Sequence, residues 1–340
     1  MNSSSDACKR ILRFIGHLPV LVLCAASFVI TSAHATGREP LPVVATFSIL
    51  GDMVKEIGGD RVRLTTIVGV NSDTHNFEAT PGDARALQHA RVLVLNGLDF
   101  EPWLNGLLEA SGFKGQQVLA SKGVKVRVLG DEVDSHDHSD HEHAHGPHDQ
   151  HGAHDGHDHH AGDVDPHAWQ DLANGMVYAR NIAAGLGKAD PRNASYYEGR
   201  AESYIARMQA LDTEIRAALA AIPRERRKVI TSHDAFGYFG DAYGVDFIAV
   251  AGLSSRSEPS ARELARIITQ AREAGVRGVF VENMSNASLI NEIARETGAI
   301  VGGTLYSDAL GPADEPAGTY LGMLSWNAGR LVYVLKRARE

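Results

Sequence analysis

Cysteine is nearly absent from this 340-residue chain, which contains only Cys8 and Cys24. Both lie in the first 35 residues, which have the pattern of a cleavable export signal. If cleavage follows Ala35, the remaining chain can form no disulfide and offers no thiolate. Any metal site in it must therefore be built from nitrogen and oxygen ligands.

The first 35 residues have the three parts of a secretory signal peptide. A basic segment, an apolar stretch and a small-residue cleavage pattern follow one another at Lys9–Arg13, residues 15–30 and Ala33–Ala35. Two alternatives are a membrane anchor and lipidation at Cys24. The apolar stretch is short for a membrane span, and Leu23 stands where lipidation needs a small residue. We therefore expect a periplasmic protein with a cleaved signal.

The chain also lacks a basic stripe and a second long apolar run. Its formal net charge is -9. Residues 131–165 hold eleven Asp or Glu and no Lys or Arg, so the rest of the chain is close to neutral. These features argue against nucleic acid as a partner and against a membrane span in the mature protein. The acidic segment should attract cations.

Eleven of the seventeen histidines fall between His136 and His160. This run has no apolar residues with which to build a core, so it predicts a solvated, histidine-rich loop. Imidazole is the commonest metal ligand in proteins, and it suits zinc, copper or nickel. The run indicates that metal comes near the protein, although it is also compatible with an insert that only improves solubility.

Apolar runs alternate with helical patterns along the mature chain, which predicts an α/β fold with parallel-type sheets. The expected strands of a first lobe are residues 42–49, 62–68, 91–95 and a short strand at 124–129. Those of a second lobe are residues 228–232, 245–249, 276–281 and 299–305. Helical patterns separate most of them.

Two Asp-Pro pairs indicate helix starts between the lobes. The pair at Asp165 predicts a helix through Leu186, and the pair at Asp190 predicts one long amphipathic helix that ends at Pro223. This helix is either a stiff connector between two lobes or a long core helix of one domain. We expect a connector. The domains are then the signal at 1–35, a first lobe at 36–189 that includes the acidic loop at 131–165, a linking helix at 190–223 and a second lobe at 224–340.

Three histidines outside the run follow strands or precede helices, at His75, His167 and His233. Ligands in open α/β sheets bind beyond the carboxyl ends of strands, so a cleft between lobes could bring these residues together. Three imidazoles and a fourth ligand make a tetrahedral zinc site. Asp308 is the best fourth candidate because it follows an expected strand. Glu282, Asp234 and water are alternatives.

These motifs resemble the periplasmic zinc-binding proteins of ABC importers. The similarity runs from about Pro40 to the C-terminus, and it rests on GVNSDTHNFEATPGD, the acidic histidine-rich loop, DPHAW, the long helix, TSHDAFGYF and TLYSDAL, in that order. The resemblance implies two α/β lobes joined by a rigid helix, with metal held in the cleft between them. It also implies His75, His167, His233 and Asp308 as the ligands.

By the same resemblance the chain is not an enzyme but a monomer that captures zinc and delivers it to a membrane permease. Relatives that carry manganese or iron commonly have a carboxylate where His233 stands, so three imidazoles favour zinc. Other divalent metals and a periplasmic zinc buffer remain alternatives. A zinc hydrolase is a weaker alternative because no His-Glu-x-x-His or Gly-x-Ser-x-Gly motif is present.

Overall fold

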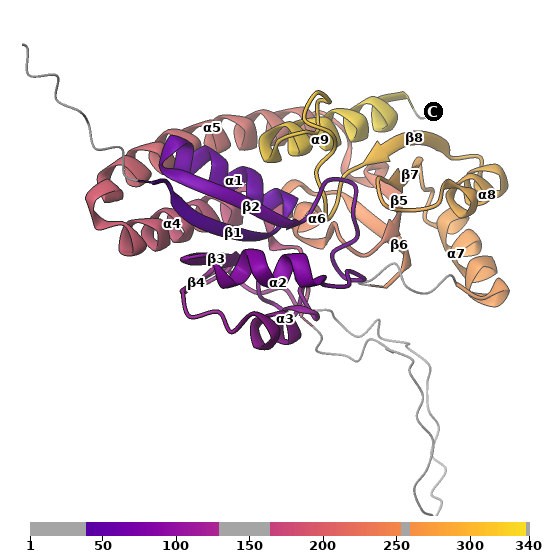
Figure 1. Ribbon diagram of the computed structural model, residues 1–340. Helices are drawn as coiled ribbons and strands as arrows, with labels where there is room; N and C mark the ends of the chain where they lie inside the picture. Colours follow the sequence, from indigo (N-terminus) through magenta and orange to yellow (C-terminus); the bar gives the residue numbers. More distant parts are fainter. Residues whose placement is uncertain (1–38, 129–163, 253–258, 338–340) are drawn as a thin grey trace, which may run out of the picture. The chain divides into compact units, whose positions relative to one another are not determined.

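The computed structural model describes residues 39–128, 164–252 and 259–337 (Figure 1). The expected signal peptide and the run from His136 to His160 lie outside these residues. All of the described residues belong to one compact unit, which begins at Glu39. Within this part of the chain, no helix is both long enough and apolar enough to cross a membrane.

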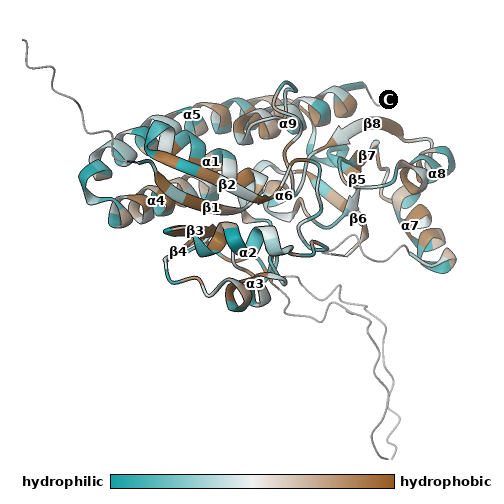
Figure 2. Cartoon of the chain, viewed as in Figure 1, coloured by the Kyte–Doolittle hydropathy of each residue, from teal (hydrophilic) through white to brown (hydrophobic). Residues whose placement is uncertain are grey.

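A first sheet of four parallel strands has the order β2-β1-β3-β4. Its strands are β1 (Leu41–Phe47), β2 (Val62–Val68), β3 (Val92–Leu95) and β4 (Gln116–Leu119). The helices that follow the first three strands are α1 (Ser48–Gly58), α2 (Pro81–Gln88) and α3 (Leu104–Ser111). The two central strands, β1 and β3, are apolar along most of their length (Figure 2), as strands covered on both faces must be.

A second parallel sheet has the order β6-β5-β7-β8, which repeats the strand pattern of the first. Its strands are β5 (Lys228–His233), β6 (Asp246–Ala251), β7 (Gly278–Glu282) and β8 (Ile300–Leu305). Its helices are α6 (Gly237–Tyr243), α7 (Ala261–Glu273), α8 (Ala287–Thr297) and α9 (Tyr320–Arg337). The prediction of two α/β lobes with parallel sheets is therefore confirmed.

Two helices run between the sheets in sequence, α4 (Leu172–Ala189) and α5 (Ala194–Ala220). Helix α5 packs on α1 and α4 near the first sheet, and on α6 and α9 near the second (Figure 1). Toward its start, Arg200 Nε donates to the carbonyl of Glu56 in α1 at 2.7 Å. Toward its end, Arg216 donates to the carbonyl of Ala242 in α6 at 2.6 Å. Helix α5 thus holds helices of both lobes, as a connector would.

One hydrophobic core joins the lobes. It extends from β1 and α1 through α4 and α5 to α6, β8 and α9. A second, smaller core lies among β5, β6, β7, α7 and α8. Because the larger core is continuous, any wide separation of the two lobes would expose apolar surface to water.

Three expectations about the elements were wrong, and one strand was missed. The first expected strand, residues 42–49, ends at Phe47, where Ser48 begins α1. Strand β4 was not expected, because it is short and begins with two glutamines. The strand expected at 124–129 is only a single bridge between Val128 and Val164. The helix expected from Asp165 begins at Leu172, after a short 3-10 turn at Ala168–Gln170.

The cap of α4 is Asp171, whose side chain accepts a hydrogen bond from the backbone N–H of Ala173 at 2.9 Å. Asp165 is buried instead and has other partners, described below. Val164 and Asp165 are the last two residues of the predicted acidic segment at 131–165, and both are ordered parts of the fold.

Candidate metal centre

Four side chains that the sequence singled out lie together in the structure: His75, His167, His233 and Asp308. One ligand atom from each lies within 4.8 Å of the others. The imidazoles of His167 and His233 and the carboxylate of Asp308 are buried, and the side chain of His75 is 10% exposed. Within residues 39–128, 164–252 and 259–337, no other group of histidine, cysteine or carboxylate side chains could hold a metal ion in this way.

The two carboxylate oxygens of Asp308 face all three histidines. His75 Nε2 lies 3.4 Å from Oδ2, His167 Nε2 lies 3.4 Å from Oδ1, and His233 Nε2 lies 3.2 Å from Oδ2. The Nε2 atoms of His75 and His167 are 3.4 Å apart. Both Asp308 oxygens and His233 Nε2 are buried without a hydrogen-bond partner. Buried polar atoms are rarely left in this state, so the group has the character of a site for a cation.

His75 comes from the loop between β2 and α2, and neighbouring aromatic rings hold this loop. Trp103 Nε1 donates to the carbonyl of Thr74 at 2.9 Å. The ring of Phe100 meets His75 edge-on, with 4.7 Å between centroids. Phe100 also contacts Trp169 at 4.7 Å. These rings form an apolar wall on the first-lobe side of the imidazoles. The wall keeps water away from the imidazoles.

His167 is oriented by Asp165. One carboxylate oxygen, Oδ1, accepts the backbone N–H of His167 at 3.0 Å and lies 2.8 Å from the ring Nδ1. This acceptor places the ring proton on Nδ1 and leaves the lone pair of Nε2 directed at Asp308. Burial raises the pKa of Asp165, but the hydrogen bonds from His167 and the charge of Arg127 outweigh burial and leave this pKa below its ordinary value.

His233 has an equivalent partner in the second lobe, Glu282. The backbone N–H of His233 donates to Glu282 Oε1 at 2.8 Å, and its Nδ1 lies 2.5 Å from Oε2. The latter contact has the distance of an ion pair, although its angles are not those of a hydrogen bond. His233 is the last residue of β5, and Glu282 is the last of β7. The pair is therefore formed by the last residues of two adjacent strands.

Asp308 belongs to the second lobe but is held by the first. Trp169 Nε1 donates to the carbonyl of Ser307 at 2.9 Å, before the carboxylate. After it, the backbone N–H of Leu310 donates to Ser48 Oγ at 3.0 Å. The backbone N–H of Asn71 donates to the carbonyl of Leu310 at 3.0 Å. These bonds fix Asp308 against the first-lobe histidines.

Charge is concentrated at this group. Burial lowers the pKa of His233, but the carboxylates of Glu282 and Asp308 outweigh burial and raise this pKa well above its ordinary value. Burial raises the pKa of Asp308, but the facing imidazoles of His233 and His167 hold it well below its ordinary value. In the metal-free protein a proton on His233 thus partly compensates the buried carboxylates.

The alternatives to Asp308 lie elsewhere. Glu282 stands behind His233, on the Nδ1 side, rather than at the Nε2 atoms. Asp234 is not part of the group, and its backbone N–H pairs with the carbonyl of Gly252 at 3.0 Å. From the sequence, Glu282 was expected only as a possible metal ligand and Asp165 only as a helix cap. Their partnership with the histidines was missed, as was Arg127. Glu282 and Arg127 contact residues distant in the chain, whereas Asp165, only two residues before His167, has the local pattern of a helix cap.

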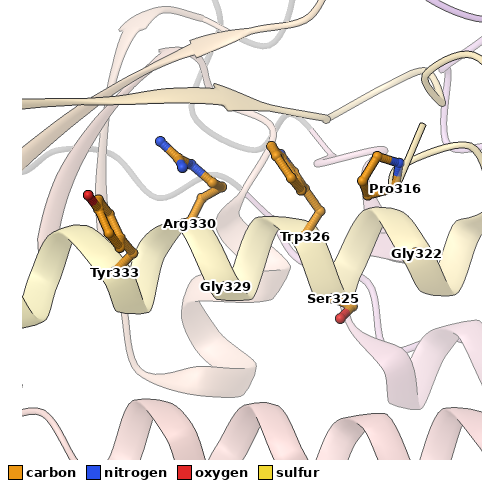
Figure 3. Close-up of a pocket in the computed structure, with 7 residues that line it drawn as sticks. All are labelled: Pro316, Gly322, Ser325, Trp326, Gly329, Arg330 and Tyr333. Carbon is orange, nitrogen blue, oxygen red and sulfur yellow. The ribbon is translucent and has the colours of Figure 1, made fainter.

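A separate hollow of about 400 Å³ lies along α9 (Figure 3). Trp326, Arg330 and Tyr333 project from the helix on the same side (Figure 3). The Arg330 guanidinium lies 5.7 Å from the Trp326 ring centre and 5.3 Å from that of Tyr333, and it donates to the carbonyl of Gly302. Neither histidine nor carboxylate lines this hollow, so it has no ligand for a metal ion.

Comparison with known proteins agrees with this architecture. Residues 43–334 match the family model described as zinc-uptake complex component A periplasmic (ZnuA). The manganese-binding lipoprotein MntA of Halalkalibacterium halodurans is 31% identical over 92% of this chain and 95% of its own. The manganese ABC transporter substrate-binding lipoprotein PsaA of Streptococcus pneumoniae is 28% identical over 95% of this chain and 97% of its own.

Solved structures agree as well. The periplasmic zinc-binding protein TroA of Treponema pallidum superposes with a TM-score of 0.74 at 28% identity, over 89% of this chain and 100% of that one. A manganese-bound periplasmic metal-binding protein of Candidatus Liberibacter asiaticus gives a TM-score of 0.70 at 26% identity, over 86% and 98%.

Fold and comparisons together define a substrate-binding component of a metal ABC transporter, and this class of protein is not enzymatic. The chain belongs to the ZnuA family of periplasmic metal-binding proteins. Such a component works with a membrane permease and its ATPase, and a divalent metal ion is its cargo.

Proposed function

We propose that the protein is the zinc-binding component of an ABC importer, and that His75, His167, His233 and Asp308 ligate the ion. The observation that carries this proposal is the spacing of the four side chains. Zinc binds nitrogen at about 2.0–2.1 Å, so the ligands of a tetrahedral site lie about 3.3 Å apart. Four contacts among these side chains, which involve both oxygens of Asp308, are 3.2 to 3.4 Å, and one ligand atom from each residue lies within 4.8 Å of the others. The group thus needs little rearrangement to surround zinc.

The donor set also supports zinc over manganese. Three imidazole nitrogens and one carboxylate suit zinc, whereas manganese prefers a larger share of oxygen. The relatives named for manganese lie at 28–31% identity, so they leave the metal open. Manganese or another divalent metal is the alternative cargo, and the distinction depends chiefly on His233.

The buried charges favour a divalent cargo. Asp165, Glu282 and Asp308 are buried carboxylates at the site, and Arg127 pairs with the first of them at 3.1 Å. If all three are ionised and all three imidazoles are neutral, Arg127 and one divalent ion neutralise them completely. Burial of a net charge is costly, so a balanced site favours the metal-loaded state.

Capture begins with loss of the proton from His233, which frees its Nε2 lone pair. Asp165 and Glu282 hold the Nδ1 sides of their histidines, so the Nε2 atoms are already directed at one point. The continuous core and the bonds on either side of Asp308 keep this arrangement in place. The permease then receives the ion from the binding protein.

We also propose that the segment His136–His160 collects zinc weakly and that the buried site binds it tightly. A solvated segment must lose conformational entropy to surround an ion, whereas the buried ligands are already ordered. The alternative is a periplasmic buffer in which this segment is the main binding element. The segment lies outside the described residues, so the support comes from its composition.

Metal analysis and competition titration of the mature protein, with and without residues 136–160, test both proposals. We expect one tight zinc site in both forms and fewer weak sites in the deletion variant. A tight site that prefers manganese would contradict the proposed cargo. Loss of the tight site from a folded deletion variant would favour the buffer.

We further propose export with cleavage after Ala35, and a monomer with a first lobe at 36–189, a linking helix at 190–223 and a second lobe at 224–340. The packing of α5 on helices of both lobes supports the linking role. Mass spectrometry of the exported protein tests the processing. A chain that starts at Thr36 is expected. A lipid-modified chain that starts at Cys24, by analogy with the relatives named lipoproteins, would contradict it.

A further inference from the structure

We propose that Arg127 is a positioning residue of the metal site, which orients His167 through the carboxylate of Asp165. The proposal rests on the ligand set proposed above. Arg127 Nη1 lies 3.1 Å from Asp165 Oδ2, while Asp165 Oδ1 accepts the ring and backbone N–H groups of His167. The two oxygens of one buried carboxylate are thus divided between the guanidinium and the imidazole.

Helix α6 of the second lobe holds Arg127 and Asp165 in this relation. The Arg127 Nε donates to Asp241 at 3.2 Å. The Tyr238 hydroxyl accepts the backbone N–H of Arg127 at 2.8 Å and lies 3.2 Å from the carbonyl of Asp165, to which it donates. A backbone hydrogen bond from Asp165 N–H to the carbonyl of Arg127, 2.9 Å long, completes the arrangement. The orientation of a first-lobe ligand therefore depends on a second-lobe helix.

The pair packs directly on Gly237, at the start of α6. A methyl group at this position would lie 2.4 Å from the guanidinium carbon of Arg127 and 2.7 Å from Asp165 Oδ2. Both contacts are far too close, so any larger residue must move the ion pair. The atoms that must move are side-chain ends rather than backbone, so the fold should survive the change.

Arg127 is a cation close to the proposed cation site, so the direction in which its removal changes zinc affinity distinguishes two roles. If Arg127 acted only through its charge, its removal would relieve repulsion and tighten zinc binding. If it positions Asp165, its removal frees His167 to rotate and weakens zinc binding. Loss of an outer partner of a metal ligand typically costs about 10- to 100-fold in affinity, and we expect about tenfold here.

The test compares Arg127→Gln and Arg127→Lys with Arg224→Gln in the mature protein. Arg224 lines the same pocket of about 430 Å³ as Arg127, but it pairs with Asp246 at 2.7 Å instead of Asp165. Zinc affinity is measured by competition titration. Long-range ¹H–¹⁵N NMR of the histidine rings reports which nitrogen of His167 carries the proton. We expect Arg127→Gln to weaken zinc binding and to disturb this tautomer, Arg127→Lys to recover part of the loss, and Arg224→Gln to change neither.

Gly237→Ala separates geometry from charge, because it removes no charged group. We expect it to weaken zinc binding as well, while Gly199→Ala, whose methyl group meets open space, leaves affinity unchanged. The proposal is overturned if Arg127→Gln binds zinc as tightly as the wild type and the His167 tautomer stays the same. The tautomer is also read in metal-free protein, so this outcome is distinguishable from a wild type that binds no zinc, which would refute the proposed function instead.

Discussion

The two lobes share one strand order but contribute differently to the candidate metal centre. In the second lobe, His233 and Glu282 are the last residues of their strands, and Asp308 follows β8 by three residues. In the first lobe, His75 stands on a long loop after β2. His167 lies beyond the first sheet, in a turn before α4.

The lobes also differ in the charge that they bring. Glu282 and Asp308 make the second lobe the acidic half of the site. The first lobe brings two imidazoles and one carboxylate, Asp165, which Arg127 neutralises. In the proposed site, attraction for the cation would thus come chiefly from the second lobe, while the first lobe would complete the shell with two imidazoles. The following predictions test this division.

The largest expected effect is an unequal loss on removing a histidine from each lobe. His233→Ala should weaken zinc binding more than 100-fold, because it deletes a ligand and leaves Glu282 buried without its partner. His75→Ala should cost about tenfold, since this side chain is 10% exposed and water can take its place. Competition titration measures both, and thermal unfolding checks that each variant is folded. Equal losses would remove the proposed difference between the lobes.

Lowering the pH should weaken zinc binding because zinc must displace a proton from His233 of the second lobe. The pKa of His233 is raised well above its ordinary value of 6.5, so this residue carries a proton at neutral pH that zinc must displace. Affinity should fall as pH decreases through neutrality, by up to tenfold per pH unit for each proton released. Titration at several pH values, with proton release measured in two buffers, tests this. A flat profile in the wild type, or an unchanged slope in His233→Ala, would contradict it.

The preference between zinc and manganese should also depend on the second lobe. His233→Glu exchanges a nitrogen ligand for oxygen at a strand end, so the ratio of manganese to zinc dissociation constants should fall about tenfold. Zinc should still bind more tightly in absolute terms. His75→Glu is the matched control, because it introduces the same carboxylate from the first lobe. If both substitutions change the ratio equally, selectivity does not reside at position 233.

Local sequence patterns predicted most elements because buried strands and amphipathic helices differ in apolar period. Seven strands were found in this way, whereas β4 lacks a continuous apolar run and was missed. The sequence also predicted that four distant residues would gather, and they do. Their role as ligands stays a prediction.

The roles of Asp165 and Glu282 could not be read from the sequence, because each has a local pattern with another ordinary meaning. Asp165 before Pro166 is typical of a helix start, and Glu282 after an apolar run resembles Asp308. The contacts with Arg127 and the two histidines decide between these roles. Two of them, Arg127–Asp165 and His233–Glu282, join residues 38 and 49 positions apart, which no local pattern reveals, although Asp165 lies only two residues before His167.

The smallest expected effect concerns the joint between the lobes, where Asp52 of α1 accepts the backbone N–H of Tyr320 of α9 at 2.8 Å. Burial raises the pKa of Asp52 from 3.8 to about 6, against the hydrogen bond from Tyr320, which lowers it. The folded state therefore holds this proton more tightly than the unfolded state. Stability must then fall as pH rises from about 4 to about 6.

Asp52→Asn keeps an acceptor for the Tyr320 N–H and removes the partly buried charge. In zinc-free protein at pH 7.5 it should raise the free energy of unfolding by about 1–2 kcal/mol, and at pH 4 the gain should vanish because Asp52 is then protonated in the folded state. Urea unfolding at both pH values measures the difference. Asp60→Asn, an exposed change whose carboxylate has a lowered pKa, is the control and should bring no gain at pH 7.5. An equal gain for Asp52→Asn at both pH values would show that burial of its charge does not strain the joint.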